Sequence, residues 1–479
     1  MGPAVLLPRL AAFCVVLILT HTLSASEFGY YALVILVGDA LDTTASFWIR
    51  FTLLRLDISN PGGWRSGFRR SYVLSIGSTI VSCIIALAAS QFLAPARSTE
   101  FFIAVSAYAG SNTLLRIGLT SLQMRQKIAL VSALECSRSL LQLAIVLLVV
   151  LASNKTFFAF NVFVAIAVFW IGVAAIGFSR SGIGPETQPS ADYRTRIKYG
   201  ASLIVLTLLS SAVLGSDRYF LKVIGGAAFV GLYSAAYALG RQPIDMIGNA
   251  INQGGFPELM KRFDAGGLVA AEAFLAETFE LYVLLISTAV ATLWCLAPTI
   301  AVALLPPPYR PAAGVLIPLI ALAGALQTIK TYVFDNIFHM YRRNWAQVAS
   351  YFPAAITTIV AAYILIKPFG AVGAGATALA GMSAGLIGSV LITRRLASVR
   401  VNLRELVNSL LIAALTGAAG FVTIHLVSGI AALPRLIAGG TACGLVWCVA
   451  VLSFRPLVLT PAINRSIALL RRISLSATA

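Results

Sequence analysis

The stretch SDRYFLKVIGGAAFVGLYSAAY, residues 216–237, places an Asp and an Arg side by side in a chain that is otherwise almost continuously apolar. The protein has 479 residues, of which 59% are hydrophobic and 11% are charged, and only 17 residues are acidic. Soluble domains carry about 25% charged residues, and a helix that crosses a bilayer needs about 20 mostly apolar residues. The composition therefore predicts an all-α polytopic membrane protein.

Fourteen apolar runs follow one another along the chain and are separated by short, mostly basic connections. They cover approximately residues 4–22, 29–49, 71–93, 101–121, 130–152, 157–178, 199–215, 227–247, 279–304, 312–334, 346–366, 371–392, 405–427 and 434–454. The run at 199–215 is the weakest of them, because we expect Asp217 to end it. We therefore expect about fourteen transmembrane helices.

The basic residues are distributed unevenly between the two sides of these runs. With a cytoplasmic N-terminus, 26 of the 35 Lys and Arg residues lie in inside segments and seven lie in outside segments. Cytoplasmic loops of membrane proteins carry this excess of positive charge. We therefore predict a multi-pass protein with both termini in the cytoplasm, and we assign the net charge of +18 to topology rather than to nucleic-acid binding.

A short internal repeat indicates that the protein has two halves. The segments LSASEFGYYALVIL (23–36) and IGGAAFVGLYSAAYAL (224–239) each hold small residues, a Phe, a Gly and two Tyr at the start of a helix. Six runs separate the two segments, so both have the same orientation in the membrane, as in transporters built from parallel repeats. We expect Gly29 and Gly231 to permit tight turns there.

Four segments carry a family resemblance. They are GSDRYFLKVIGGAAFVGLYSAAYALGRQPIDMIGNAINQGGFPEL, SEFGYYALVI, YRPAAGVLIPLIALAGALQTIKTYVFDNIFHMYRRNWAQ and LIKPFGAVGAGATALAGM, and together they extend over most of the chain. They resemble Wzx-type polysaccharide flippases of the multidrug/oligosaccharidyl-lipid/polysaccharide exporter superfamily. The resemblance implies two six-helix lobes around a central cavity, at 1–198 and 199–396, with two extra helices and a basic cytoplasmic tail in 397–479.

The same resemblance implies a function in the bacterial inner membrane. A protein of this type flips an undecaprenyl-diphosphate-linked oligosaccharide to the outer leaflet, for exopolysaccharide, lipopolysaccharide or another surface polysaccharide. The implied partners are this lipid-linked oligosaccharide and membrane lipids, with a polysaccharide polymerase and export machinery as further candidates. No cofactor is implied, and the six cysteines share no metal-ligand spacing.

Ionisable residues inside the predicted spans are candidates for the substrate site, because a charge within a membrane usually faces a cavity or a partner. Guanidinium and ammonium groups suit a diphosphate. The candidates for substrate contact are Arg50, Arg116, Arg138 and Lys330, and those for coupling or gating are Asp39, Asp42, Asp217, Arg218 and Asp245. We expect Arg138 and Lys330 to face one shared cavity, and Glu135 to be able to pair with Arg138 at the i,i+3 spacing.

Two interpretations of the Asp217–Arg218 pair stay open. The pair either anchors the outside end of a helix among lipid headgroups or forms part of an outside gate. At the level of the whole protein, the alternatives are a peptidoglycan-precursor flippase, a cation-coupled drug exporter and, more remotely, an integral-membrane polymerase. A polymerase is expected to carry a large outside loop or paired acids at the membrane face, and the sequence shows neither. We therefore predict a transporter rather than an enzyme.

Overall fold

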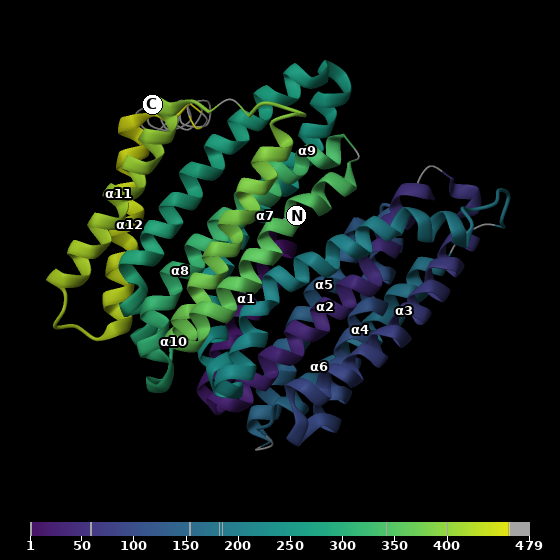
Figure 1. The fold of residues 1–479 in the computed structure, drawn as a ribbon, viewed down its shortest axis with the longest axis horizontal. Coiled ribbons are helices and arrows are strands. Elements are labelled where there is room, and N and C mark those ends of the chain that lie inside the picture. The colour runs from purple at the N-terminus through teal and green to yellow at the C-terminus, as the bar shows by residue number, and fades with distance from the viewer. Residues whose placement is uncertain are drawn as a thin grey trace, which may run out of the picture. The chain divides into compact units, whose positions relative to one another are not determined.

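The computed structural model describes residues 2–57, 60–152, 155–181, 183, 185–341, 343–399, 401–457 and 459 (Figure 1). These residues form helices and no strands. Nine of the helices in this part of the chain are long and apolar enough to cross a membrane. The predicted all-α polytopic class is therefore confirmed, whereas the count of fourteen spans stays a prediction. Arg465, Arg471 and Arg472 of the expected basic tail lie outside the described residues.

Glycines with positive φ interrupt the two longest helices. In α7 (Tyr193–Leu304) these are Gly226 at +79° and Gly267 at +65°, and in α10 (Asn344–Thr393) it is Gly370 at +55°. A side chain is strained in this backbone conformation, so glycine is the residue that permits the break. As a result, α7 consists of three segments, 193–225, 227–266 and 268–304.

The chain divides into two compact units. Unit 1 comprises residues 1–238 and 347–381, and unit 2 comprises residues 239–346 and 382–479. The boundary falls inside α7 and inside α10, so both of these helices contribute to each unit. The lobe boundaries predicted from the sequence stay predictions.

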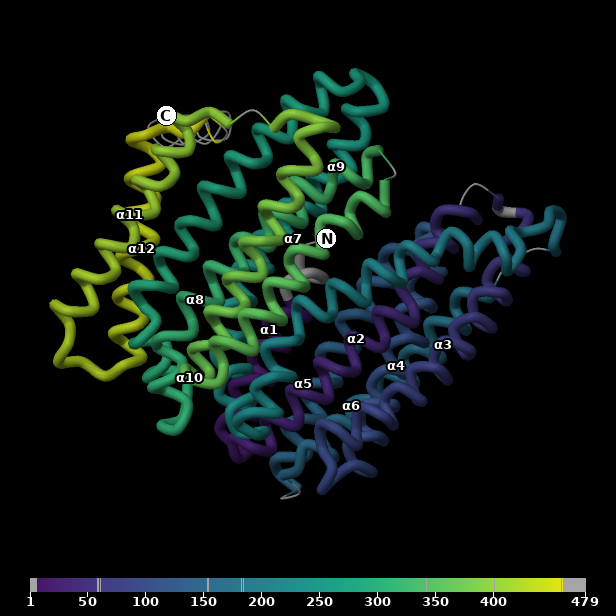
Figure 2. The backbone as a smooth tube through the Cα atoms, in the orientation of Figure 1, coloured from purple at the N-terminus to yellow at the C-terminus, as the bar shows by residue number. Residues whose placement is uncertain are grey.

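Unit 1 contains six complete helices. They are α1 (Gly2–Thr22), α2 (Ala25–Leu56), α3 (Trp64–Leu93), α4 (Ser98–Met124), α5 (Ile128–Leu151) and α6 (Phe157–Arg180), with the short η1 (Pro61–Gly63) and η2 (Pro95–Arg97) between them. Helix α4 packs against α2, α3 and α6, and α1 packs against α5 (Figures 1 and 2). Trp48, Phe68 and Tyr72 are buried in one of its apolar clusters. Large apolar side chains such as Ile76 on α3 are exposed, as expected for helices surrounded by lipid.

Unit 2 holds the rest of α7 and the C-terminal helices. Its other elements are η3 (Pro307–Tyr309), α8 (Arg310–Ile329), the π-helical segment η4 (Lys330–Phe334), α9 (Asp335–Met340), α11 (Leu403–Leu426) and α12 (Ala432–Phe454). Helices α11 and α12 lie side by side as a hairpin (Figure 1). Ile244, Tyr282 and Val333 are buried together in the core of this unit.

Candidate functional site

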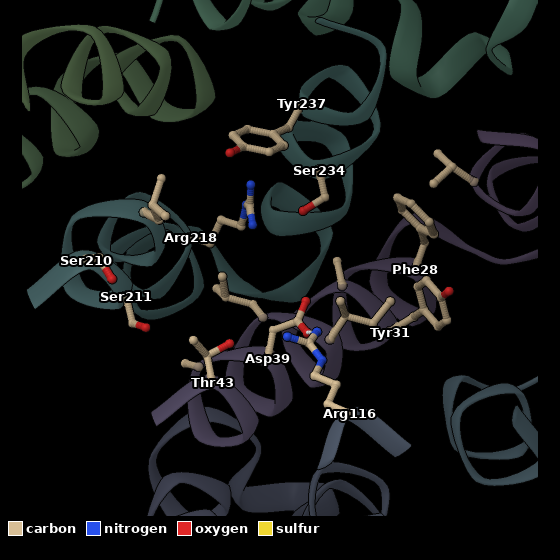
Figure 3. Close-up of a pocket in the computed structure, with 16 residues that line it drawn as sticks. Phe28, Tyr31, Asp39, Thr43, Arg116, Ser210, Ser211, Arg218, Ser234 and Tyr237 are labelled. Atoms are coloured by element: carbon tan, nitrogen blue, oxygen red, sulfur yellow. Dashed lines mark hydrogen bonds and ion pairs between the residues drawn. The ribbon is translucent and has the colours of Figure 1, made fainter. Parts of the chain in front are cut away.

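A cavity of about 420 Å³ lies within unit 1, between α2, α4 and the first two segments of α7 (Figure 3). Its polar lining residues are Asp39, Thr43, Arg116, Ser210, Ser211, Arg218, Ser234 and Tyr237. Apolar and aromatic side chains such as Phe28 and Tyr31 make up the rest of the wall. An apolar cavity with a few converging polar groups is the usual form of a ligand site.

Two carboxylates of α2 hold Arg116 of α4 at this cavity. The Nε atom of Arg116 forms an ion pair with Asp42 Oδ2 at 2.9 Å, and Nη2 donates to Asp39 Oδ1 at 3.3 Å. Asp42 is fully buried and also accepts from Thr113 Oγ1 at 2.7 Å, while Tyr108 Oη donates to Asp39 Oδ1 at 3.1 Å. Because a buried charge is costly unless it is paired, these contacts fix the Arg116 guanidinium in one place.

Arg218 reaches the same cavity from α7, and its guanidinium lies against the ring of Tyr237 (Figure 3). Its Cζ atom is 3.9 Å from the centroid of that ring, a cation–π contact. The Nε and Nη2 atoms of Arg218 are buried, and neither has a hydrogen-bond partner among the residues that the structure describes. A charged donor that is left unsatisfied in this way is expensive, so the group is suited to an anionic ligand.

Asp217 does not end its helix, and this corrects the expectation from the sequence. The first segment of α7 continues past Asp217 to residue 225, because the break occurs at Gly226. Asp217 is also only 3% exposed, so the protein encloses its side chain. Its carboxylate accepts from Tyr233 Oη at 2.5 Å and from the Arg218 backbone N–H at 2.7 Å, which allows it to be buried.

The two copies of the internal repeat contact each other directly. A Cβ atom on Gly29 of α2 would lie 1.8 Å from the carbonyl oxygen of Ala227, and one on Gly231 of α7 would lie 2.1 Å from the carbonyl oxygen of Ala25. Each glycine therefore admits the backbone of the other copy. Both glycines lie inside helices, so they serve close packing rather than the tight turns expected from the sequence.

A family model described as polysaccharide biosynthesis protein matches residues 3–261, which is more than half of the chain. The chain belongs to this polysaccharide biosynthesis family. The resemblance expected from the four segments is thereby confirmed. No curated protein matches the chain in a sequence search.

Solved structures show which fold this polysaccharide biosynthesis protein has. It is 11% identical to a structure described as "Lipid II flippase MurJ, inward closed conformation", with a TM-score of 0.74 over 95% of this chain and 99% of that one. It is 14% identical to an inward-facing multidrug resistance MATE family transporter of the MOP superfamily, with a TM-score of 0.59 over 83% of this chain and 94% of that one. The outward-facing form of a MATE family transporter gives 12% identity and a TM-score of 0.56, over 83% and 93%. The fold is that of MOP-superfamily transporters.

The other candidates for substrate contact, Arg50, Arg138 and Lys330, do not line the 420 Å³ cavity. Arg138 donates through Nε to Glu135 Oε2 at 3.1 Å, so the pairing expected from their spacing is confirmed. Arg50 lies farther along α2, where its Cζ atom is 5.9 Å from the centroid of the Phe47 ring. The roles of Arg50 and Arg138 in substrate binding stay predictions.

Unit 2 contains the remaining candidates. Lys330 is buried and donates to Asp335 Oδ2 at 2.8 Å, while Ser389 donates to Asp335 Oδ1 at 2.9 Å. Asp245 accepts from Nε of Arg241 at 2.8 Å, one turn before it on α7. Because Arg138 and Lys330 belong to different units, a cavity shared by them stays a prediction. In the described part of the chain, no group of three His, Cys, Asp or Glu residues is placed to hold a metal ion.

The sequence did not single out three serines of the cavity wall, Ser210, Ser211 and Ser234. A serine hydroxyl in a membrane helix can also donate a hydrogen bond to a carbonyl oxygen of the preceding turn. Ser210 does so, with its Oγ atom 3.0 Å from the carbonyl oxygen of Thr207. No feature of the sequence therefore distinguishes a serine that lines a cavity from one that only packs.

Proposed function

We propose that this protein moves an undecaprenyl-diphosphate-linked oligosaccharide from the inner to the outer leaflet of the bacterial inner membrane, by alternating access, for surface polysaccharide synthesis. The observation that carries the proposal is the buried Arg218 guanidinium, which has two unpartnered donors at a cavity that Arg116 also lines. Membership of the polysaccharide biosynthesis family supports the glycan part of the substrate.

The chemistry of the two arginines fits a diphosphate. Guanidinium groups form short, charge-assisted and often bidentate hydrogen bonds with phosphate oxygens. A phosphate oxygen at Nε and Nη2 of Arg218 would remove a penalty of about 1–3 kcal/mol for each unsatisfied donor. The serines and Tyr237 supply neutral donors around the same cavity.

Asp39 and Asp42 differ in a way that gives them different roles in this proposal. The Asp39 side chain is 45% exposed, whereas that of Asp42 is fully buried. Asp42 therefore keeps Arg116 in position, while Asp39 is the partner that a phosphate can displace. Exchange of Arg116 between Asp39 and the substrate is the step at which binding is coupled to a change in the protein.

The contact between the two repeat copies closes the cavity on the outside in this proposal. Phe28 and Tyr31, on either side of Gly29, both line the cavity, and so does Ser234, three residues after Gly231. Separation of the helices at the two glycines would therefore move the cavity wall itself. A transporter that exposes its site alternately to the two sides needs a contact of this kind.

The test is deletion of the gene followed by analysis of surface polysaccharide and of lipid-linked intermediates. We expect surface polysaccharide to disappear and the lipid-linked oligosaccharide to accumulate on the cytoplasmic side. The wild-type gene and an Arg55→Gln variant should restore export, because Arg55 is exposed in the last turn of α2. Arg218→Gln should fail to restore it although the protein reaches the membrane.

Reconstitution of the purified protein in liposomes separates the alternatives. Flipping of a lipid-linked oligosaccharide, with no flipping of a peptidoglycan precursor, is the expected result. Flipping of the peptidoglycan precursor alone would refute the proposed substrate. Uptake of a cationic dye without movement of either lipid would instead identify a drug exporter.

A further inference from the structure

A second cavity, of about 390 Å³, lies in unit 1 where α3 begins and α6 ends, and three arginines line it. Arg65 and Arg69 lie one turn apart at the start of α3, and Arg180 is the last residue of α6. Phe68 and Ile183 are the other described residues of the lining, and no acidic residue is among those described. The side chains of all three arginines are exposed. Like charges one turn apart on a helix repel each other, so a bound anion would relieve the repulsion between Arg65 and Arg69.

Neighbouring arginines at this end of unit 1 have partners within the protein. Arg70 donates through Nη1 to the carbonyl oxygens of Ser190 and Ala191, both at 2.7 Å. Arg196 is fully buried and forms an ion pair with Asp57. Both arginines therefore have partners that fix their side chains, and Arg196 also has an acidic partner.

The three arginines of the 390 Å³ cavity differ from these neighbours. Within the described ranges, the side chains of Arg65 and Arg69 have no hydrogen bond or ion pair, and no carboxylate lies within ion-pair distance of Arg180. Arg180 instead lies over the Tyr72 ring, with its Cζ atom 5.0 Å from the centroid. That contact orients the guanidinium and leaves its charge uncompensated.

The cavity lies at the border between polar and apolar surface. Val73, one turn after Arg69, is 50% exposed, and Phe178, two residues before Arg180, is 47% exposed. A helix rises about 1.5 Å per residue, so Val73 is about 6 Å from Arg69 along the axis. Exposed apolar side chains of a membrane protein face hydrocarbon, which places the arginines at the level of the headgroups.

We propose that this cavity binds the phosphate headgroup of an anionic phospholipid, in the leaflet at the end that the charge distribution predicts to be cytoplasmic. Guanidinium groups suit phosphate oxygens, and basic pockets between membrane helices on that side bind anionic headgroups. The acyl chains then lie on the exposed apolar surface that begins at Val73 and Phe178. The site is separate from the Arg116–Arg218 cavity and does not depend on the transported substrate.

The test is native mass spectrometry of the delipidated full-length protein, titrated with phosphatidylglycerol or phosphatidylcholine. We expect one phosphatidylglycerol to bind about a hundredfold more tightly than phosphatidylcholine, because each of the three arginines near an anionic lipid contributes roughly a fivefold factor. Arg65→Gln/Arg69→Gln should reduce this preference to about fivefold, because only Arg180 remains, and Arg65→Lys/Arg69→Lys should keep most of it. Arg55→Gln is the matched control, because it removes an exposed arginine from the last turn of α2 and should bind like the wild type.

Three results would overturn the proposal. One is equal affinity of the wild type for the two lipids, and another is an unchanged preference in the double Gln variant. The third result concerns the source of the phosphate and comes from titration of inorganic pyrophosphate by calorimetry. The proposal expects pyrophosphate to bind much more weakly than the lipid, because it has no acyl chains. If pyrophosphate binds as tightly and the double Gln variant loses it, the cavity takes a soluble phosphate compound. Equal melting temperatures of the variants would exclude misfolding as the cause.

Discussion

Substitution of Gly29 by alanine tests whether the contact between the two repeat copies closes the cavity. The added Cβ would lie 1.8 Å from the carbonyl oxygen of Ala227. Carbon and oxygen in close backbone contact are about 3.3–3.6 Å apart, so the two helices must separate by about 1.5 Å. Overpacking of this kind typically costs about 1–3 kcal/mol.

This cost applies only to the closed arrangement, because the two backbones do not touch once the helices have separated. A difference of about 1–3 kcal/mol changes the ratio of the two arrangements by about 5- to 150-fold. Gly29→Ala should therefore increase the open fraction by a factor in this range. Gly231→Ala should act in the same direction, since its Cβ would lie 2.1 Å from the carbonyl oxygen of Ala25.

The assay is labelling of a cysteine placed at Ser211, which lines the cavity, with a membrane-impermeant maleimide added outside intact cells. The protein has six native cysteines, and their labelling is measured in the protein that keeps Ser211 and is subtracted. We expect labelling to increase at least about fivefold in Gly29→Ala. The matched control is Gly77→Ala on α3, where an added Cβ would meet nothing within 4 Å. Unchanged labelling in a folded Gly29→Ala protein would refute the idea that this contact closes the cavity.

Three further predictions concern topology, the buried acid and the buried ion pair of unit 2. Reporter fusions after Arg97, Lys155 or Arg310 should report an outside position, and inside signals at two of these sites would contradict the topology. Asp217→Asn should impair flipping while the protein still accumulates in the membrane; normal transport, or loss of the protein from the membrane, would assign Asp217 a structural role only. Lys330→Met leaves Asp335 buried without its ion-pair partner and should lower the free energy of unfolding by about 3–5 kcal/mol, whereas Lys330→Met/Asp335→Leu should lower it less. Thermal unfolding in detergent measures both variants, and a double variant that is less stable than Lys330→Met would contradict this reasoning.

Composition and short-range spacing predicted what depends on one helix at a time. The long apolar runs predicted a polytopic helical protein, because backbone groups in lipid must be satisfied within a helix. The i,i+3 spacing of Glu135 and Arg138 predicted their contact, because residues three apart lie on one face of a helix, here α5.

Contacts between helices could not be predicted in this way. Asp39 and Arg116 were both expected to lie inside spans, but their pairing depends on how α2 packs against α4. The stacking of Arg218 on Tyr237 depends on the break at Gly226, which turns the chain back between them. A double glycine in a sequence indicates a possible break, but it does not determine the direction of the next segment.

In the proposed mechanism, the contact between the repeat copies is a closure that a duplicated motif forms and that can open again. Gly29 and Gly231 occupy the same position in the two copies, and each accommodates the carbonyl oxygen four residues before the other glycine. Contacts between Cα–H groups and carbonyl oxygens contribute only about 0.5–1 kcal/mol each. A buried ion pair at the same place would cost several kcal/mol to separate. In the proposed mechanism, glycine in both copies thus gives a fit close enough to close the cavity, with interactions weak enough for substrate binding at Arg116 and Arg218 to reverse it.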